Sequence, residues 1–123
     1  MKHSPEFLKL VEDSRTRVHE VTIDDVLGKQ RRQEPFEFVD VREDSEWAAG
    51  HAAGARHLGR GVIERDIETA IPDRGREIIL YCGGGFRSAL SADNLQKMGY
   101  RRVFSMAGGM RAWRERGLPE EKP

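Results

Sequence analysis

The chain has 123 residues, of which 37% are hydrophobic and 34% charged, and its 21 basic residues balance its 21 acidic residues. This length suits one domain with its own hydrophobic core. Zero net charge argues against a nucleic-acid-binding protein, because phosphate binding needs a basic surplus. One cysteine, Cys82, cannot form an internal disulfide, which favours a reducing compartment.

The opening stretch, "MKHSPEFLKLVEDSR", lacks the apolar region of a secretory signal. No stretch approaches the ~18 to 20 apolar residues of a membrane span. We therefore expect a cytoplasmic protein with no membrane and no nucleic-acid partner.

Short strands and helices alternate in the predicted secondary structure. The first helix begins at Pro5 after the N-cap Ser4, and the next begins after the N-cap Thr22. In chain order, the remaining predictions of the first half are a strand over 17–21, a strand over Phe36–Val41, a short helix ending at Gly50 and a brief strand over 55–58.

The second half continues the alternation. It contains a predicted helix over 61–71 that stops at Pro72, a strand over Glu77–Cys82, a helix over 88–98, a strand over 102–106 and a helix over 109–116. This order implies βαβ units and an α/β fold, a three-layer sandwich with a mainly parallel central sheet flanked by helices. Ligand sites in such sheets lie beyond the carboxyl ends of the strands, where Cys82 and the segment 40–42 fall.

The stretch "CGGGFR" joins a central strand to a helix. Three glycines allow the backbone to curl so that N–H groups point inward, and such a nest at a helix N-terminus stabilises an anion. The natural anion is the Cys82 thiolate, so we predict a reactive nucleophile that is charged at neutral pH. The alternative interpretation is a buried structural cysteine before a glycine-rich turn. A plain turn seldom needs three glycines, which favours the functional interpretation.

Four segments, in order, resemble the rhodanese family of sulfurtransferases. They are "DVRE" at 40–43, "EWAAGHAAGARHL" at 46–58, the loop Cys-x-x-Gly-x-Arg at Cys82, Gly85 and Arg87, and "GYRRVFSMAGGMRAWRERGLP" at 99–119. Two positions depart from the family pattern, Ala52 and Met106, and both keep an apolar residue. The resemblance implies a rhodanese-like domain over 18–119, with an N-terminal helical extension over 1–17 and a C-terminal tail over 120–123.

The resemblance also implies a mechanism. Cys82 attacks the sulfane sulfur of a donor such as thiosulfate, forms a persulfide, and passes the sulfur to cyanide or a thiol. No cofactor and no metal are expected. The residues expected to form the active-site loop and bind the anion are Gly83, Gly84, Gly85, Phe86, Arg87 and Ser88. Arg87 is expected to attract the donor or to tie the loop, and Ser88 to donate a hydrogen bond to the thiolate.

Three supporting residues are also expected. Asp40 is predicted to accept N–H groups of the cysteine loop, and Arg42 to form a structural ion pair with Glu46. His51 is expected to be a structural hydrogen-bonding residue, because an ionised thiol needs no base.

Three alternatives remain beside a sulfurtransferase with small substrates. A sulfur-relay protein would share the persulfide and differ in its acceptor, another protein. A non-catalytic binding module is disfavoured by the retained cysteine, glycine and arginine. A cysteine phosphatase is disfavoured because such loops resemble Cys-x5-Arg, whereas here four residues separate Cys82 from Arg87.

Overall fold

A computed structural model describes residues 2–123 of the chain, and its centre is a five-stranded parallel sheet. The strand order is β1-β6-β5-β2-β4. These strands are β1 (His19–Val21), β6 (Val103–Met106), β5 (Ile78–Tyr81), β2 (Glu37–Asp40) and β4 (Arg56–His57). The α/β fold class predicted from the sequence is confirmed.

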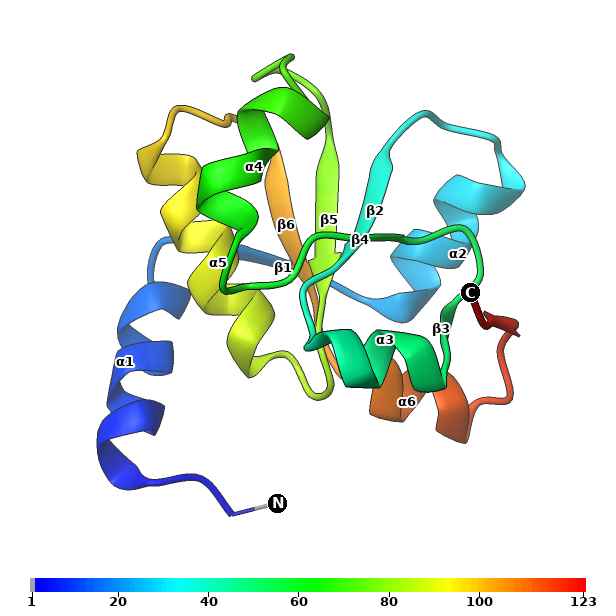
Figure 1. Ribbon diagram of the computed structural model, residues 1–123, viewed down its shortest axis with the longest axis horizontal. Helices are drawn as coiled ribbons and strands as arrows, with labels where there is room; N and C mark the ends of the chain where they lie inside the picture. The colour runs from blue at the N-terminus through cyan, green and yellow to red at the C-terminus, as the bar shows by residue number, and fades with distance from the viewer. Residues whose placement is uncertain (1) are drawn as a thin grey trace.

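Helices cover both faces of the sheet (Figure 1). On one face lie α4 (Ile63–Ala70) and α5 (Phe86–Lys97), and on the other lie α2 (Ile23–Arg31) and α6 (Gly109–Glu115). The remaining helices are α1 (Pro5–Arg15) and α3 (Asp44–Ala49). Within residues 2–123, no helix has the length and apolar character that a membrane crossing requires.

Strand β5 is buried on both sides, and its side chains alternate between the two cores. Ile78 and Leu80 pack with α4 and α5, whereas Ile79 and Tyr81 pack with α2 and α6. A central parallel strand is covered by helices on both faces, which explains its continuous apolar sequence. Cys82 follows this strand directly, so the core fixes the place where the cysteine loop begins.

Two differences from the sequence prediction concern the surroundings of the site. Helix α5 begins at Phe86, two residues before the predicted start at Ser88, because Gly85 serves as its N-cap. A second, antiparallel sheet pairs β3 (His51–Ala52) with β7 (Glu120–Glu121), which are the first two residues of the predicted tail. Strands of two residues carry no apolar periodicity, so the sequence contains no signal for this pair.

Helix α1 packs on the outside of α5 rather than on the sheet. Val11 is fully buried against Ala89 and Leu90, with Phe7 and Phe86 at the edge of this small cluster. Arg17, just beyond the helix, donates to both carboxylate oxygens of Asp93, at 2.9 and 2.8 Å. The hydrogen bonds from Arg17 hold the pKa of Asp93 below its ordinary value. Apolar packing and an ion pair therefore both hold α1 against α5.

Candidate active site

Cys82 lies at the carboxyl end of β5, and its side chain is 1% exposed. The Gly85 N–H donates to the Cys82 Sγ at 3.1 Å. Gly85 has φ +98°, a left-handed conformation that a residue with a Cβ rarely adopts. Of the three loop glycines, Gly85 alone has a positive φ, so this residue makes the turn that aims an amide at the sulfur.

Two buried serines extend the hydrogen bonding behind the sulfur. The Ser88 Oγ lies 3.5 Å from the Cys82 Sγ and 2.7 Å from the Ser105 Oγ. Ser88 and Ser105 are both fully buried, on α5 and β6. This arrangement allows Ser88 to donate to the sulfur while it accepts from Ser105. Ser88 is a residue predicted from the sequence, whereas Ser105 is not, because a lone serine in a strand carries no motif.

The start of α6 is docked on the cysteine loop. The Met110 N–H donates to the Cys82 carbonyl oxygen at 2.8 Å, and the Arg111 N–H donates to the Gly83 carbonyl oxygen at 3.0 Å. Gly109, with φ +53°, sits so close that a Cβ there would overlap the Cys82 carbonyl oxygen and lie 2.8 Å from the Gly83 carbonyl carbon. Only glycine permits this approach.

Arg87 is tied to α3. Its guanidinium donates to the two carboxylate oxygens of Glu46, at 2.7 and 3.1 Å. The hydrogen bonds from Arg87 lower the pKa of Glu46 to about 2, and Glu46 in turn raises the pKa of Arg87. The expected Arg42–Glu46 ion pair is therefore wrong, because the loop arginine reaches Glu46 and takes its carboxylate.

Arg42 pairs with Asp40 instead. The Asp40 carboxylate accepts from the Arg42 backbone N–H at 2.8 Å and from its guanidinium at 2.9 Å, and both side chains are buried. Burial opposes the charge of Arg42, but the hydrogen bonds and charge of Asp40 outweigh it and raise the pKa of Arg42. The expectation that Asp40 accepts N–H groups of the cysteine loop is also wrong, since its hydrogen bonds go to Arg42. The two residues brace the loop after β2.

His51 stacks on a tryptophan. Its ring lies 3.4 Å from the Trp47 ring, centroid to centroid, at an interplanar angle of 2°. Its Nδ1 lies 3.3 Å from the Trp47 carbonyl oxygen. The pocket above Cys82 is lined by other residues, so these contacts fit the expected structural role.

Cys82 is one of the residues that line a pocket of about 740 Å³. Four arginines line it, and three are engaged: Arg42 with Asp40, Arg87 with Glu46, and Arg114 with Glu120 at 3.1 Å. Across the described chain, the fourth, Arg111, forms no side-chain ion pair or hydrogen bond with another residue. Arg111 is therefore the arginine of this pocket whose charge no other side chain of the described residues neutralises. It was not predicted from the sequence.

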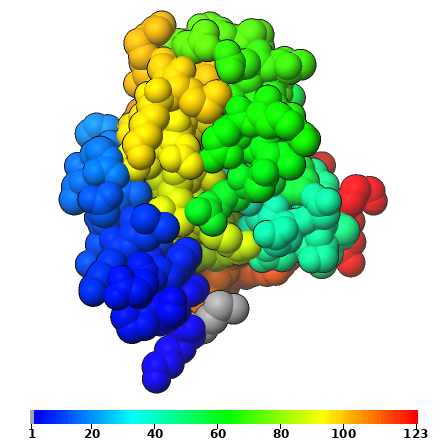
Figure 2. Space-filling model, turned by 60° about the vertical axis from the view of Figure 1, so that its left-hand side comes forward, coloured from blue at the N-terminus to red at the C-terminus, as the bar shows by residue number. Residues whose placement is uncertain are grey.

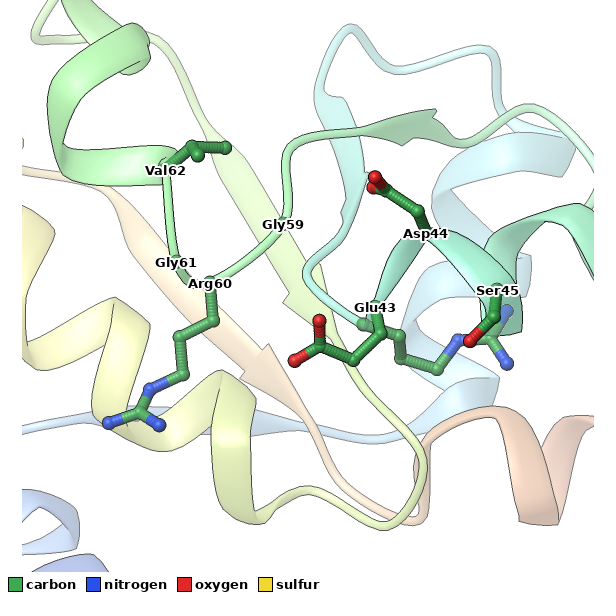
Figure 3. Close-up of a pocket in the computed structure, with 8 residues that line it drawn as sticks. Glu43, Asp44, Ser45, Gly59, Arg60, Gly61 and Val62 are labelled. Carbon is green, nitrogen blue, oxygen red and sulfur yellow. The ribbon is translucent and has the colours of Figure 1, made fainter.

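A second, smaller pocket of about 340 Å³ lies on the other side of Arg42. It runs between the start of α3, with Glu43, and the turn from Gly59 to Gly61 (Figure 3). Glu43 and Arg60 project from opposite walls in this view. Cys82 lines the larger pocket and is not among the residues that line this one.

A family model described as "Rhodanese-like domain" matches residues 22–116 of the chain. The chain is 37% identical over 84 residues to the thiosulfate sulfurtransferase GlpE of Pseudomonas putida, covering 68% of this chain and 74% of that protein. It is 30% identical over 106 residues to a sulfurtransferase of Allochromatium vinosum, covering 86% and 97%. A Bacillus subtilis relative, "Putative sulfur carrier protein YrkF", is 27% identical over 101 residues, which are 82% of this chain and 54% of its own length. The chain thus spans about half of that protein.

One solved structure matches almost the whole chain, α1 included. It belongs to a Rhodopseudomonas palustris protein of unknown function, described as a "Possible Tyrosine Phosphatase", with a TM-score of 0.86 and 25% identity. The match covers 98% of both chains.

Replacing Gly109 with alanine tests the close approach of α6. We expect Gly109→Ala to lower the free energy of unfolding by about 1 to 3 kcal/mol more than Gly117→Ala, because only the first adds overpacking to backbone strain. Gly117 also has a left-handed φ, +63°, but nothing lies within 4 Å of its Cβ position. Denaturant unfolding measures both variants. Equal losses of unfolding free energy in the two variants would show that the left-handed φ alone, without the close approach of α6, explains why position 109 is a glycine.

The Arg87–Glu46 pair should give a defined pH dependence. Because the pKa of Glu46 falls from 4.5 to about 2 on folding, its contribution is complete above pH 4.5 and lost as the pH drops toward 2. We expect Glu46→Gln to destabilise the protein at pH 7, and the difference from wild type to shrink as the pH falls below 4.5. Unfolding free energies between pH 7 and pH 3 test this, with the exposed Glu12→Gln as a charge-matched control. A difference in unfolding free energy between Glu46→Gln and wild type that does not change with pH would contradict the lowered pKa of Glu46.

Proposed function

Because this chain belongs to the rhodanese-like domain family, we propose that it moves sulfane sulfur from a donor such as thiosulfate to a thiophilic acceptor such as cyanide or a thiol. Cys82 carries the sulfur as a persulfide. The observation that supports this most directly is the hydrogen bond from the Gly85 N–H to the Cys82 Sγ, beside a pocket that four arginines line. The named sulfurtransferase relatives agree with this chemistry.

In the first half-reaction, the Cys82 thiolate attacks the sulfane sulfur of thiosulfate. A sulfur–sulfur bond forms to Cys82, the bond inside thiosulfate breaks, and sulfite leaves with the electron pair. Arg111 can hold the anionic donor, since its charge is not used by another side chain. The Gly85 N–H and the Ser88 hydroxyl stabilise negative charge on the cysteine sulfur.

In the second half-reaction, the acceptor attacks the outer sulfur of the persulfide. Cyanide leaves as thiocyanate, and Cys82 takes back the electron pair as a thiolate. The same hydrogen-bond donors that stabilise the attacking thiolate stabilise it as the leaving group. Small sulfur compounds are the proposed partners. A relay protein is the alternative acceptor, which the sulfur-carrier name of one relative favours.

A phosphatase, the activity suggested for the Rhodopseudomonas palustris neighbour, fits this site less well. Arg87, the arginine that ends the loop, is held by Glu46 in two hydrogen bonds. A tetrahedral phosphate would need that guanidinium and a wider ring of amides. The short loop brings a single glycine amide to the sulfur, which suits a compact anion.

The central prediction is that thiosulfate adds one sulfur atom to Cys82 and that cyanide removes it. Intact-mass spectrometry after each addition measures this, and thiocyanate formation measures turnover. Cys82→Ser should fold but show neither mass gain nor turnover, because a hydroxyl is a poor nucleophile without a base. Turnover near the wild-type rate in this variant would eliminate the persulfide mechanism.

Arg111 should contribute to donor binding. We expect Arg111→Ala to raise the KM for thiosulfate about tenfold with a small change in kcat, the effect of losing one charge-assisted contact. Arg116→Ala removes the same charge from an exposed position outside the pocket and serves as the matched control. Equal KM changes in the two variants would mean that net charge, rather than a binding contact, is responsible.

A further inference from the structure

Three buried groups form a chain of contacts behind the cysteine sulfur. The Ser88 Oγ, on α5, lies 3.5 Å from the Cys82 Sγ and 2.7 Å from the Ser105 Oγ, on β6. Cys82 is 1% exposed, and both serines are fully buried. Among the residues that the structure describes, the Ser105 Oγ has no hydrogen-bond partner other than the Ser88 Oγ. The chain of contacts therefore begins at the sulfur and ends at Ser105.

The end of this chain is enclosed by secondary structure. Strand β6, which carries Ser105, lies between β1 and β5 in the sheet. Helix α5, which carries Ser88, lies between α1, in blue, and α4, in green, on the face that Figure 2 shows. Because Ser105 is not exposed to bulk solvent, its hydroxyl has to find a hydrogen-bond partner within the protein.

The direction of the hydrogen bonds follows from counting protons, since each serine hydroxyl has one proton to donate. If Ser105 donates to Ser88, then Ser88 donates to the sulfur, and each hydroxyl proton has an acceptor. If Cys82 instead donates as a thiol to Ser88, then Ser88 donates to Ser105, and the Ser105 proton is left without an acceptor. A buried donor without an acceptor costs free energy, so the first direction is favoured.

In the favoured direction the sulfur accepts two hydrogen bonds. One comes from the Ser88 hydroxyl and the other from the Gly85 N–H, 3.1 Å away. A hydrogen bond to an ionised acceptor is stronger than one between neutral groups, so this arrangement favours the thiolate over the thiol. Ser105 is not in contact with the sulfur, and it contributes by leaving the Ser88 proton free for it.

We propose that Ser105 is a positioning residue that directs the Ser88 proton to the Cys82 sulfur and so stabilises negative charge there. This role rests on the proposed function. When an acceptor attacks the outer sulfur of the persulfide, the sulfur–sulfur bond breaks and its electron pair stays on Cys82. The Ser88 proton remains on its own oxygen and is donated to that charge. Ser105 thereby makes Cys82 a better leaving group in the second half-reaction.

The pH dependence of Cys82 alkylation by iodoacetamide tests this role, because the thiolate is the nucleophile. We expect Ser105→Ala to move the pH midpoint of the alkylation rate upward by about 0.5 to 1, the effect of losing one hydrogen bond that orients the donor. An unchanged midpoint in this variant would overturn the proposal.

Ser91→Ala is the matched control for the loss of a buried hydroxyl. Ser91 is also fully buried on α5, and its Oγ has no hydrogen-bond partner within residues 2–123. This variant should leave the alkylation midpoint where it is in the wild type. A shift as large as that of Ser105→Ala would assign the effect to the packing of α5 and overturn the proposal.

A double mutant separates positioning from packing. Since Ser105 acts through Ser88, Ser105→Ala should shift the alkylation midpoint in the wild type but add no further shift to Ser88→Ala. A shift of equal size in both backgrounds would show that Ser105 affects the sulfur independently of the Ser88 proton, and the positioning role would be wrong.

The second half-reaction gives a readout that depends on sulfur transfer. After loading with thiosulfate, cyanide should remove the sulfur from Ser105→Ala about three- to tenfold more slowly than from the wild type in a single turnover. An unchanged rate would overturn the leaving-group role. Alkylation needs no sulfur donor, so the two proposals can fail separately. If thiosulfate adds no sulfur to Cys82 while the alkylation midpoint shifts as expected, the proposed function fails and the direction of the Ser88 proton is still supported.

Discussion

The site depends on the contact between the first turn of α6 and the backbone of the cysteine loop. Two consecutive N–H groups of α6 bind the carbonyl oxygens of Cys82 and Gly83, and Gly109 makes the approach sterically possible. Because these carbonyls are held on one side, the loop can present the Gly85 N–H to the sulfur on the other. The same contact determines where Arg111 stands, since its own backbone N–H forms one of the two bonds. One docking interaction thus fixes the positions of both the Cys82 loop and Arg111.

The four arginines of the pocket differ in what neutralises them. Asp40 neutralises Arg42 in a buried pair, Glu46 holds Arg87 across the loop, and Glu120 pairs with Arg114 near the chain end. Removing one partner from a buried pair would leave an uncompensated charge. An arginine in such a pair therefore stabilises the fold, and its charge is already neutralised. An arginine without a partner has its full charge available for a substrate anion. Pairing in space, rather than position in a motif, therefore separates the ion-paired arginines of the pocket from the one that has no partner within the described residues.

The sequence predicted the fold well, because the central strand and its flanking helices follow apolar periodicities that burial imposes. It also predicted the position of Cys82 at a strand end. It failed on Asp40 and Arg42, which bond to each other within one short turn after β2, because the sequence does not show which way the two side chains point. It also failed on the partner of Glu46, because that pair depends on how α3 and α5 meet in space. Ser105 and Arg111 were missed for the same reason, since each reaches the site from a strand or helix that is distant in sequence. The glycine pair at 108–109 was seen as part of a resemblance, whereas its reason, a backbone contact, needed the structure.

The N-terminal helix shows how a segment outside the family-matched region can line the pocket beside the cysteine loop. A helix of 11 residues is marginal in water by itself, so α1 owes its order to docking on α5. Part of that docking is made to the loop itself, through Arg15 and the Gly85 carbonyl. The amide of the same glycine touches the cysteine sulfur. The position of α1 and the geometry at the sulfur are therefore linked through one residue, Gly85.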